Sequence, residues 1–163
     1  MNPLPESNQT PSEFERLLAG LARNGVDFAV VGGIAVILNG YPRVTLDVDI
    51  LANSSPENLR KLLKSLESWG EGWARELKIE DFAVEEGAIR VSETFDLDIF
   101  VKMRGKMLDD FRSNLRYFES EGTRIAYLPP ADLIFLKEGS WREKDRFDVS
   151  AMKEILAREA KQP

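Results

Sequence analysis

The sequence predicts an α/β protein in which helices flank a mixed β-sheet. Short apolar runs of strand length alternate along the chain with segments whose apolar residues recur at helical spacing. The expected order is helix, strand, helix, strand, helix, strand, strand, followed by helices, which is typical of a sheet with helices packed against it. The chain has 163 residues, of which 43% are apolar and 31% charged, so it is long enough to bury a core of its own.

The first elements are delimited by capping and turn residues. Residues 1–10 are polar and contain two prolines, so we expect a flexible tail. Ser12 and Glu15 have capping-box spacing and begin a helix that Gly25 ends. An apolar strand is expected from Val26 to Val31, because this run has strand length and ends at two glycines.

The next three elements follow from periodicity and capping. A short apolar helix is expected at residues 34–38. Residues 43–50 alternate strictly between polar and apolar side chains, which predicts a half-buried strand. Ser55 as N-cap, followed by a proline, begins a helix to about residue 69.

The second half of the sequence contains weaker signals. Residues 70–87 have no clear periodicity, and residues 107–118 fit a helix or a strand. The remaining expected elements are strands at 89–91, 95–101 and 123–128 and helices at 130–137 and 142–160.

Composition excludes several kinds of chemistry. The chain contains neither cysteine nor histidine, so thiolate catalysis, Ser-His-Asp triads and histidine-bound zinc are absent. Any catalysis must use carboxylates, lysine, arginine, tyrosine, hydroxyls, backbone amides or a hard cation. The net charge of −6 gives no overall field that attracts nucleic acid, although a local basic patch remains possible. No apolar run has membrane-spanning length and the first residues lack a signal-peptide pattern, so we expect a cytoplasmic protein without membrane contact.

Asp47 and Asp49 give the strongest functional signal. Residues two apart on a strand lie about 6–7 Å apart on the same face. Two carboxylates at that spacing can converge on one Mg²⁺ ion, which prefers oxygen ligands. An isolated Asp-x-Asp is more often a solvated strand face. The neighbouring residues therefore decide whether this pair is interpreted as a metal site.

Gly32 and Gly33 supply that context. They lie between an apolar strand and a short helix, fourteen to seventeen positions before the two aspartates. Glycine lets the backbone approach a phosphate closely, and a helix N-terminus offers free N–H groups. Together with the carboxylate strand, this turn predicts a phosphate site facing a metal site.

A third carboxylate is expected from another strand, because metal-assisted phosphoryl transfer often uses a second ion or an activated nucleophile. Asp98 has apolar neighbours on both sides and is our choice. Asp96 lies on the same strand face and remains the alternative.

These residues carry a family resemblance. The stretch from Phe28 to Leu51 resembles the signature of DNA polymerase β-type nucleotidyltransferases: an apolar strand, Gly-Gly or Gly-Ser, a helix, and then Asp-x-Asp on the next strand. Within that superfamily it is most similar to a small prokaryotic branch that includes abortive-infection-type nucleotidyltransferase toxins. The branch's Arg-x-Thr-x-Asp-x-Asp motif matches residues 43–49.

A second block supports the same resemblance. Residues 128–137 and 142–149 resemble the branch's Lys-x₄-Arg-x-Lys-Asp-x-x-Asp-Val segment, with Lys137 as the lysine. After the tail at 1–10, which composition predicts, we expect a nucleotidyltransferase core at 11–128 and a C-terminal helical extension at 129–163.

The resemblance implies an enzyme that transfers a nucleotide from an NTP to an acceptor hydroxyl with Mg²⁺ or Mn²⁺. The nucleotide-binding set is Gly32, Gly33, Arg43 and Thr45; the metal-binding set is Asp47, Asp49 and Asp98; and Lys137 is expected near the phosphates. Lys137 could equally be a solvated helix residue. Arg43 could equally pair with a neighbouring carboxylate instead of contacting phosphate. Arg142, Lys144, Asp145 and Asp148 are expected to form an ion-pair network at a helix start.

The acceptor remains open among RNA or tRNA, a protein and a small molecule. The branch implies a toxin of a toxin–antitoxin pair, with an antitoxin or helical partner protein. The alternative from another class is a catalytically silent nucleotide-binding module or partner subunit.

Overall fold

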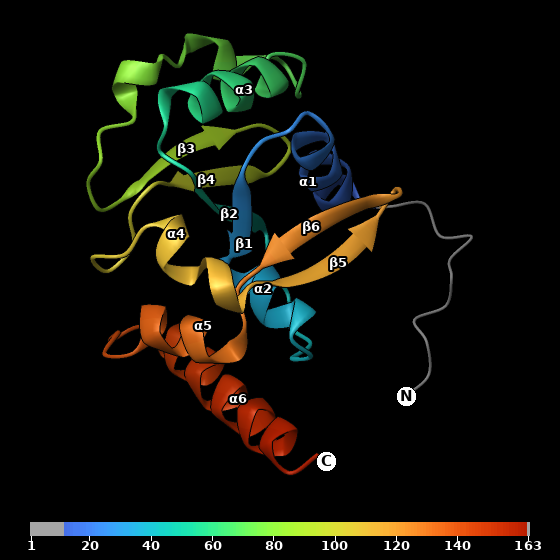
Figure 1. Ribbon diagram of the computed structural model, residues 1–163, viewed down its shortest axis with the longest axis vertical. Coiled ribbons are helices and arrows are strands. Elements are labelled where there is room, and N and C mark those ends of the chain that lie inside the picture. Colours follow the sequence, from blue (N-terminus) through green and yellow to red (C-terminus); the bar gives the residue numbers. More distant parts are fainter. Residues whose placement is uncertain (1–11, 163) are drawn as a thin grey trace.

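The computed structural model describes residues 12–162, and the tail expected at residues 1–10 lies outside this range. Its centre is one six-stranded mixed sheet with the strand order β3-β4-β2-β1-β6-β5 (Figure 1). The strands are β1 (Phe28–Val31), β2 (Asp47–Ala52), β3 (Ala88–Ser92), β4 (Asp96–Phe100), β5 (Arg116–Ser120) and β6 (Thr123–Tyr127). The predicted α/β class with a mixed sheet is confirmed.

Strand directions explain how distant segments meet at the centre of the sheet. β2 pairs antiparallel with β1 and parallel with β4. β6 pairs parallel with β1, and β3–β4 and β5–β6 are antiparallel pairs. β2 and β4 therefore run side by side in the same direction, and their first residues lie at the same edge.

Helices surround this sheet. They are α1 (Glu13–Arg23), α2 (Gly32–Leu38), α3 (Pro56–Leu66), α4 (Leu108–Phe111), α5 (Pro130–Lys137) and α6 (Glu143–Ala160), with short 3-10 turns at Trp73–Glu76, Ile79–Asp81 and Arg112–Asn114. α1 packs against β6 and α3, α2 against β1, β2 and α5, and α5 along α6. The α5–α6 pair lies at the end of the molecule opposite α3 (Figure 1). No helix within residues 12–162 combines the length and apolar character needed to cross a membrane.

Ser12 and Ser55 cap their helices as predicted, whereas the Glu15 carboxylate accepts a hydrogen bond from Ser120 rather than completing the predicted capping box. The Ser12 side chain accepts a hydrogen bond from the Glu15 backbone N–H at 3.2 Å, and Ser55 accepts one from the Asn58 N–H at 3.2 Å. Each bond satisfies a backbone donor that the first helical turn leaves free.

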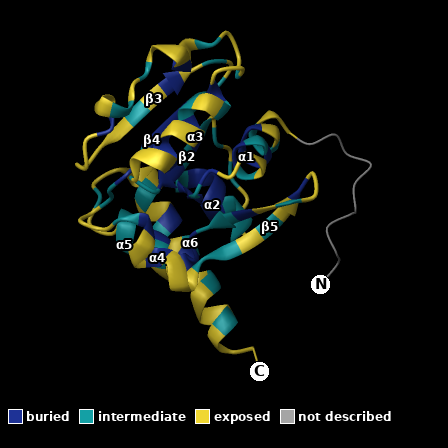
Figure 2. Ribbon diagram, turned by 45° about the horizontal axis from the view of Figure 1, so that its top comes forward, coloured by how far each residue is buried: buried dark blue, intermediate teal, exposed yellow. Residues whose placement is uncertain are grey.

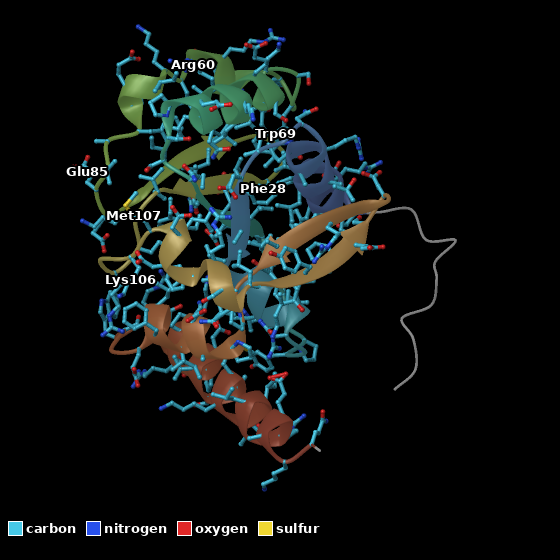
Figure 3. All side chains as sticks on the ribbon, viewed as in Figure 1. Phe28, Arg60, Trp69, Glu85, Lys106 and Met107 are labelled. Carbon is cyan, nitrogen blue, oxygen red and sulfur yellow. The ribbon has the colours of Figure 1, made fainter. Side chains whose placement is uncertain are left out.

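The core lies along the central strands and the inner helix faces. β1 is buried at all four positions, and Val48, Ile50 and Leu51 of β2 are fully buried. Phe28 lies within this packed interior, whereas Arg60 on α3 lies at the outer surface (Figure 3). The distal end of α6 is mostly exposed (Figure 2). The sheet thus provides a rigid base for side chains at its edge.

The prediction of a strand over residues 43–50 was wrong at its beginning. β2 starts at Asp47, and Val44 and Leu46 are 82% and 75% exposed. The ladder explains the difference, because the last paired residue of β1 meets Asp49 and the first of β4 meets Asp47. Residues 43–46 have no neighbouring strand to pair with, so their alternation does not produce a buried face.

Two other segments differ from the expectation. α2 begins at Gly32 rather than residue 34, so both glycines belong to the helix. The ambiguous residues 107–118 contain α4, a 3-10 turn and the start of β5. β5 was missed because its exposed and half-buried residues pair only with β6 at the sheet edge.

Candidate active site

A pocket of about 260 Å³ lies where β1, β2 and β4 approach α5 and α6. All predicted site residues line it: Gly32, Gly33, Arg43, Thr45, Asp47, Asp49, Asp98 and Lys137. Asp96, the alternative third carboxylate, is not among the lining residues. The structure therefore brings the predicted glycine turn, carboxylates and cations into one site.

The carboxylates come from two parallel neighbours in the sheet. In the β2–β4 ladder, Asp47 lies opposite Asp96 and Asp49 opposite Asp98. The Asp98 side chain is 10% exposed and that of Asp96 is 30% exposed. Asp98 thus lies deeper and beside Asp49, which is the position expected for a shared cation site.

Asp49 shows how concentrated the negative charge is. Burial raises its pKa to about 7, and the neighbouring charge and hydrogen bond of Asp98 and the charge of Asp47 act in the same direction. Lys137 has a smaller opposing effect on this pKa. A cation bound beside Asp49 would favour its ionised form and so act against both the burial and the neighbouring carboxylates.

Arg90, which sequence analysis missed, lies among these carboxylates. Its Nε and Nη2 donate to the two oxygens of Asp98 at 2.8 and 2.9 Å. Its Nη1 is 3.2 Å from Asp96 Oδ2, and its Nη2 is 3.7 Å from Asp47 Oδ2. The signal for it is the β3–β4 register, which sets Arg90 directly opposite Asp98.

The donor set fits a divalent cation if Arg90 moves. Within the described residues, no group of three carboxylates is already arranged as a metal site. Asp47, Asp49 and Asp98 nevertheless all line one pocket and offer only oxygen ligands, which suits Mg²⁺ or Mn²⁺. The raised pKa of Asp49 is consistent with that fit.

The two glycines allow close approaches of different kinds. Gly32 has φ +66°, and a Cβ there would lie 2.1 Å from Asp49 Oδ2. Gly33 has no such φ, but its Cβ would lie 2.7 Å from Arg43 Nη2 and 2.9 Å from Thr45 Oγ1. The left-handed residue is therefore Gly32, and its missing side chain is what allows Asp49 to lie against the turn.

Arg43 and Lys137 share one buried carboxylate of α6, that of Asp148. Arg43 Nε is 3.0 Å from Asp148 Oδ1, and Lys137 Nζ lies 2.9 Å from Asp148 Oδ2 and 3.1 Å from Asp145 Oδ1. The Asp148 side chain is 1% exposed and that of Lys137 12%. Lys137 is thus not a solvated helix residue, and Arg43 pairs with a carboxylate in this structure.

This network differs from the local one expected at the start of α6. Arg142 pairs with Asp145 at 3.9 Å as expected, but Asp148 pairs with residues of other elements. The network joins the loop before β2 to both C-terminal helices. It therefore fixes one wall of the pocket relative to the carboxylate strands.

Comparison with known families agrees with this geometry. A family model described as "Nucleotidyltransferase of unknown function (DUF6036)" matches residues 13–158. The chain belongs to this nucleotidyltransferase family. The superfamily indicated by the motifs is therefore confirmed, whereas the toxin branch stays a prediction.

Solved structures show the same nucleotidyltransferase fold. The lincosamide antibiotic adenylyltransferase LnuA, bound to lincomycin, is 17% identical with a TM-score of 0.61, covering 90% of this chain and 99% of LnuA. An antigenic nucleotidyltransferase-like protein from Paracoccidioides brasiliensis is 20% identical with a TM-score of 0.56, covering 88% and 76% of the two chains. The Thermotoga maritima protein TM1012, also assigned to the nucleotidyltransferases, is 16% identical with a TM-score of 0.51, covering 90% and 94%. Among curated proteins, none matches the sequence significantly.

Proposed function

We propose that this nucleotidyltransferase moves a nucleoside monophosphate from an NTP to an acceptor hydroxyl, with Mg²⁺ or Mn²⁺ held by Asp47, Asp49 and Asp98. The observation that carries the proposal is the single pocket in which a glycine turn faces carboxylates on two adjacent strands. A bound divalent cation would neutralise phosphate charge and orient the reacting oxygens.

The chain's own residues have separable roles in this proposal. Gly32 and Gly33 let the backbone approach the triphosphate, and Thr45 lines the same wall. Lys137 lies at the pocket wall, where its charge would stabilise the negative charge that develops on the transferred phosphate. Asp98 lies beside Asp49 and completes the ligand set or accepts the acceptor's proton.

The activity is tested by supplying each labelled NTP with Mg²⁺ and a total cell extract, and by finding which fraction gains label. Asp47→Asn is the matched control, because it removes one charge with almost no change in shape. Label transfer by the parent and not by the variant supports the proposal. NTP binding by both without transfer to any fraction would favour the alternative of a silent nucleotide-binding module.

The same experiment separates the acceptor classes, because RNA, protein and small molecules are recovered separately. LnuA is described as acting on a lincosamide antibiotic, so lincosamides belong in the small-molecule arm. We extend the proposal to a toxin of a toxin–antitoxin pair. In that case induced expression of the parent arrests growth, whereas expression of Asp47→Asn does not. If cells that express active parent enzyme grow normally, the toxin role is rejected.

A further inference from the structure

Arg90 engages the carboxylate that the proposed metal ion needs. Both oxygens of Asp98 accept hydrogen bonds from Arg90, at 2.8 and 2.9 Å. A planar guanidinium bound to a carboxylate through two parallel hydrogen bonds is among the strongest polar pairs in proteins. A cation that binds Asp98 would therefore compete with Arg90 for the same two oxygens, and the two positive charges would repel each other there.

The same side chain also reaches the neighbouring carboxylates. Arg90 lies 3.2 Å from Asp96 and 3.7 Å from Asp47, so one positive charge serves three aspartates. Without it, these like charges on adjacent strands would repel one another. In the protein without metal, Arg90 is thus the counter-charge of these three aspartates.

The position of Arg90 also allows its side chain to move away from Asp98. Arg90 belongs to β3, an edge strand of the sheet, and its side chain is 54% exposed although Asp98 is nearly buried. Arg90 lines the same pocket as Gly32 and Gly33, where the triphosphate would lie. Phosphate oxygens accept the same paired hydrogen bonds from a guanidinium as a carboxylate does.

We propose that Arg90 and the divalent cation compete for Asp98 and Asp47, and that the triphosphate receives Arg90 when the metal displaces it. This inference rests on the proposed function, because it assumes the metal and the NTP. Its consequence is that the metal binds weakly to the protein alone and more tightly once nucleotide offers Arg90 another partner. Arg90 is a positioning residue that makes metal binding depend on nucleotide.

The test measures Mn²⁺ affinity without nucleotide, by the loss of the free-ion EPR signal. Arg90→Gln should bind Mn²⁺ about tenfold or more tightly than the parent, since a competing charged hydrogen-bond pair is gone. Its melting temperature in EDTA should fall, because the carboxylates lose their counter-charge. A merely structural Arg90 would not produce tighter metal binding.

Two further variants make the result specific. Arg90→Lys keeps the charge but loses the planar fork, so its Mn²⁺ affinity should lie between those of the parent and Arg90→Gln. Arg142→Gln removes the same charge from the pocket wall without a pairing to Asp47 or Asp98, so its Mn²⁺ affinity should stay within about twofold of the parent's.

The outcomes are distinguishable. If the Arg90 variants bind Mn²⁺ as tightly as the parent, or more weakly, Arg90 does not compete with the metal. The proposed function is not affected by that result. Equal tightening in Arg142→Gln and Arg90→Gln also overturns the competition, because the effect would then be general electrostatics. If neither the parent nor any folded variant binds Mn²⁺ with or without each NTP, the proposed metal-dependent function fails as well.

Discussion

Replacing Gly32 by alanine separates backbone strain from crowding at the carboxylate site. The φ of +66° is one that L-residues avoid, at a cost of about 1–2 kcal/mol. A Cβ would also lie 2.1 Å from Asp49 Oδ2 and 2.8 Å from its Cγ. Such overlap typically costs a further 1–3 kcal/mol or so. Gly32→Ala should therefore lower the free energy of unfolding by roughly 2–5 kcal/mol.

Gly122→Ala is the matched control. Gly122 has φ +72° in the β5–β6 turn, and no atom lies within 4 Å of its Cβ position, so this variant reports the strain alone. Any gain from a stiffer unfolded chain is the same in both and cancels in the comparison. Urea unfolding should then show that Gly32→Ala is about 1–3 kcal/mol less stable than Gly122→Ala.

A second readout covers relaxation of the site. If the Asp49 side chain turns away from the new methyl group, the difference in stability shrinks but Mn²⁺ affinity falls. Equal stability of the two variants together with parent-like Mn²⁺ affinity in Gly32→Ala would refute the argument, since Asp49 would then not depend on the missing side chain.

Three other predictions concern the carboxylates and their partners. Asp98→Asn should reduce nucleotide transfer by about a hundredfold or more, while Asp96→Asn keeps most of it; equal mild losses would contradict a site built on Asp98. Lys137→Met removes one partner from the buried Asp148 and from the half-buried Asp145, so urea unfolding should show a loss of about 1–3 kcal/mol, and unchanged stability would contradict a stabilising role of this network. The hydrogen bond from Arg112 lowers the pKa of Asp27, so this pair stabilises the fold above the ordinary aspartate pKa and loses that effect as pH falls through the lowered value. Asp27→Asn should therefore be less stable than the parent at neutral pH, and the difference should shrink as pH falls through the lowered pKa of Asp27. A stability difference that does not change with pH would contradict this.

Local signals predicted the helices well, because caps act within one turn. Ser12 and Ser55 make the expected bonds to N–H groups three residues on. The glycine turn and the two aspartates also follow from local spacing, since both lie within one continuous stretch of the chain. The sequence could therefore predict most elements and the residues that form the first half of the candidate site.

The beginning of β2 shows where local pattern fails. Residues 43–46 alternate as regularly as the strand itself, yet pairing with β1 and β4 starts only at Asp47. Whether an alternating segment is a strand depends on a partner, and the partner is set by tertiary structure. β5 could not be predicted for the same reason, because its strand conformation depends on pairing with β6.

The charge balance of the site depends on contacts that are distant in sequence. Asp148 lies 105 residues from Arg43 but is bound by it, and the same carboxylate accepts a hydrogen bond from Lys137, whose side chain is only 12% exposed. Arg90 is only eight residues from Asp98, yet without the hairpin register it looks like any exposed arginine on a strand. A search restricted to carboxylates and glycines finds the groups that would bind metal and phosphate. It does not find Arg90, which pairs with those carboxylates in the structure and, in our proposal, competes with the metal for them.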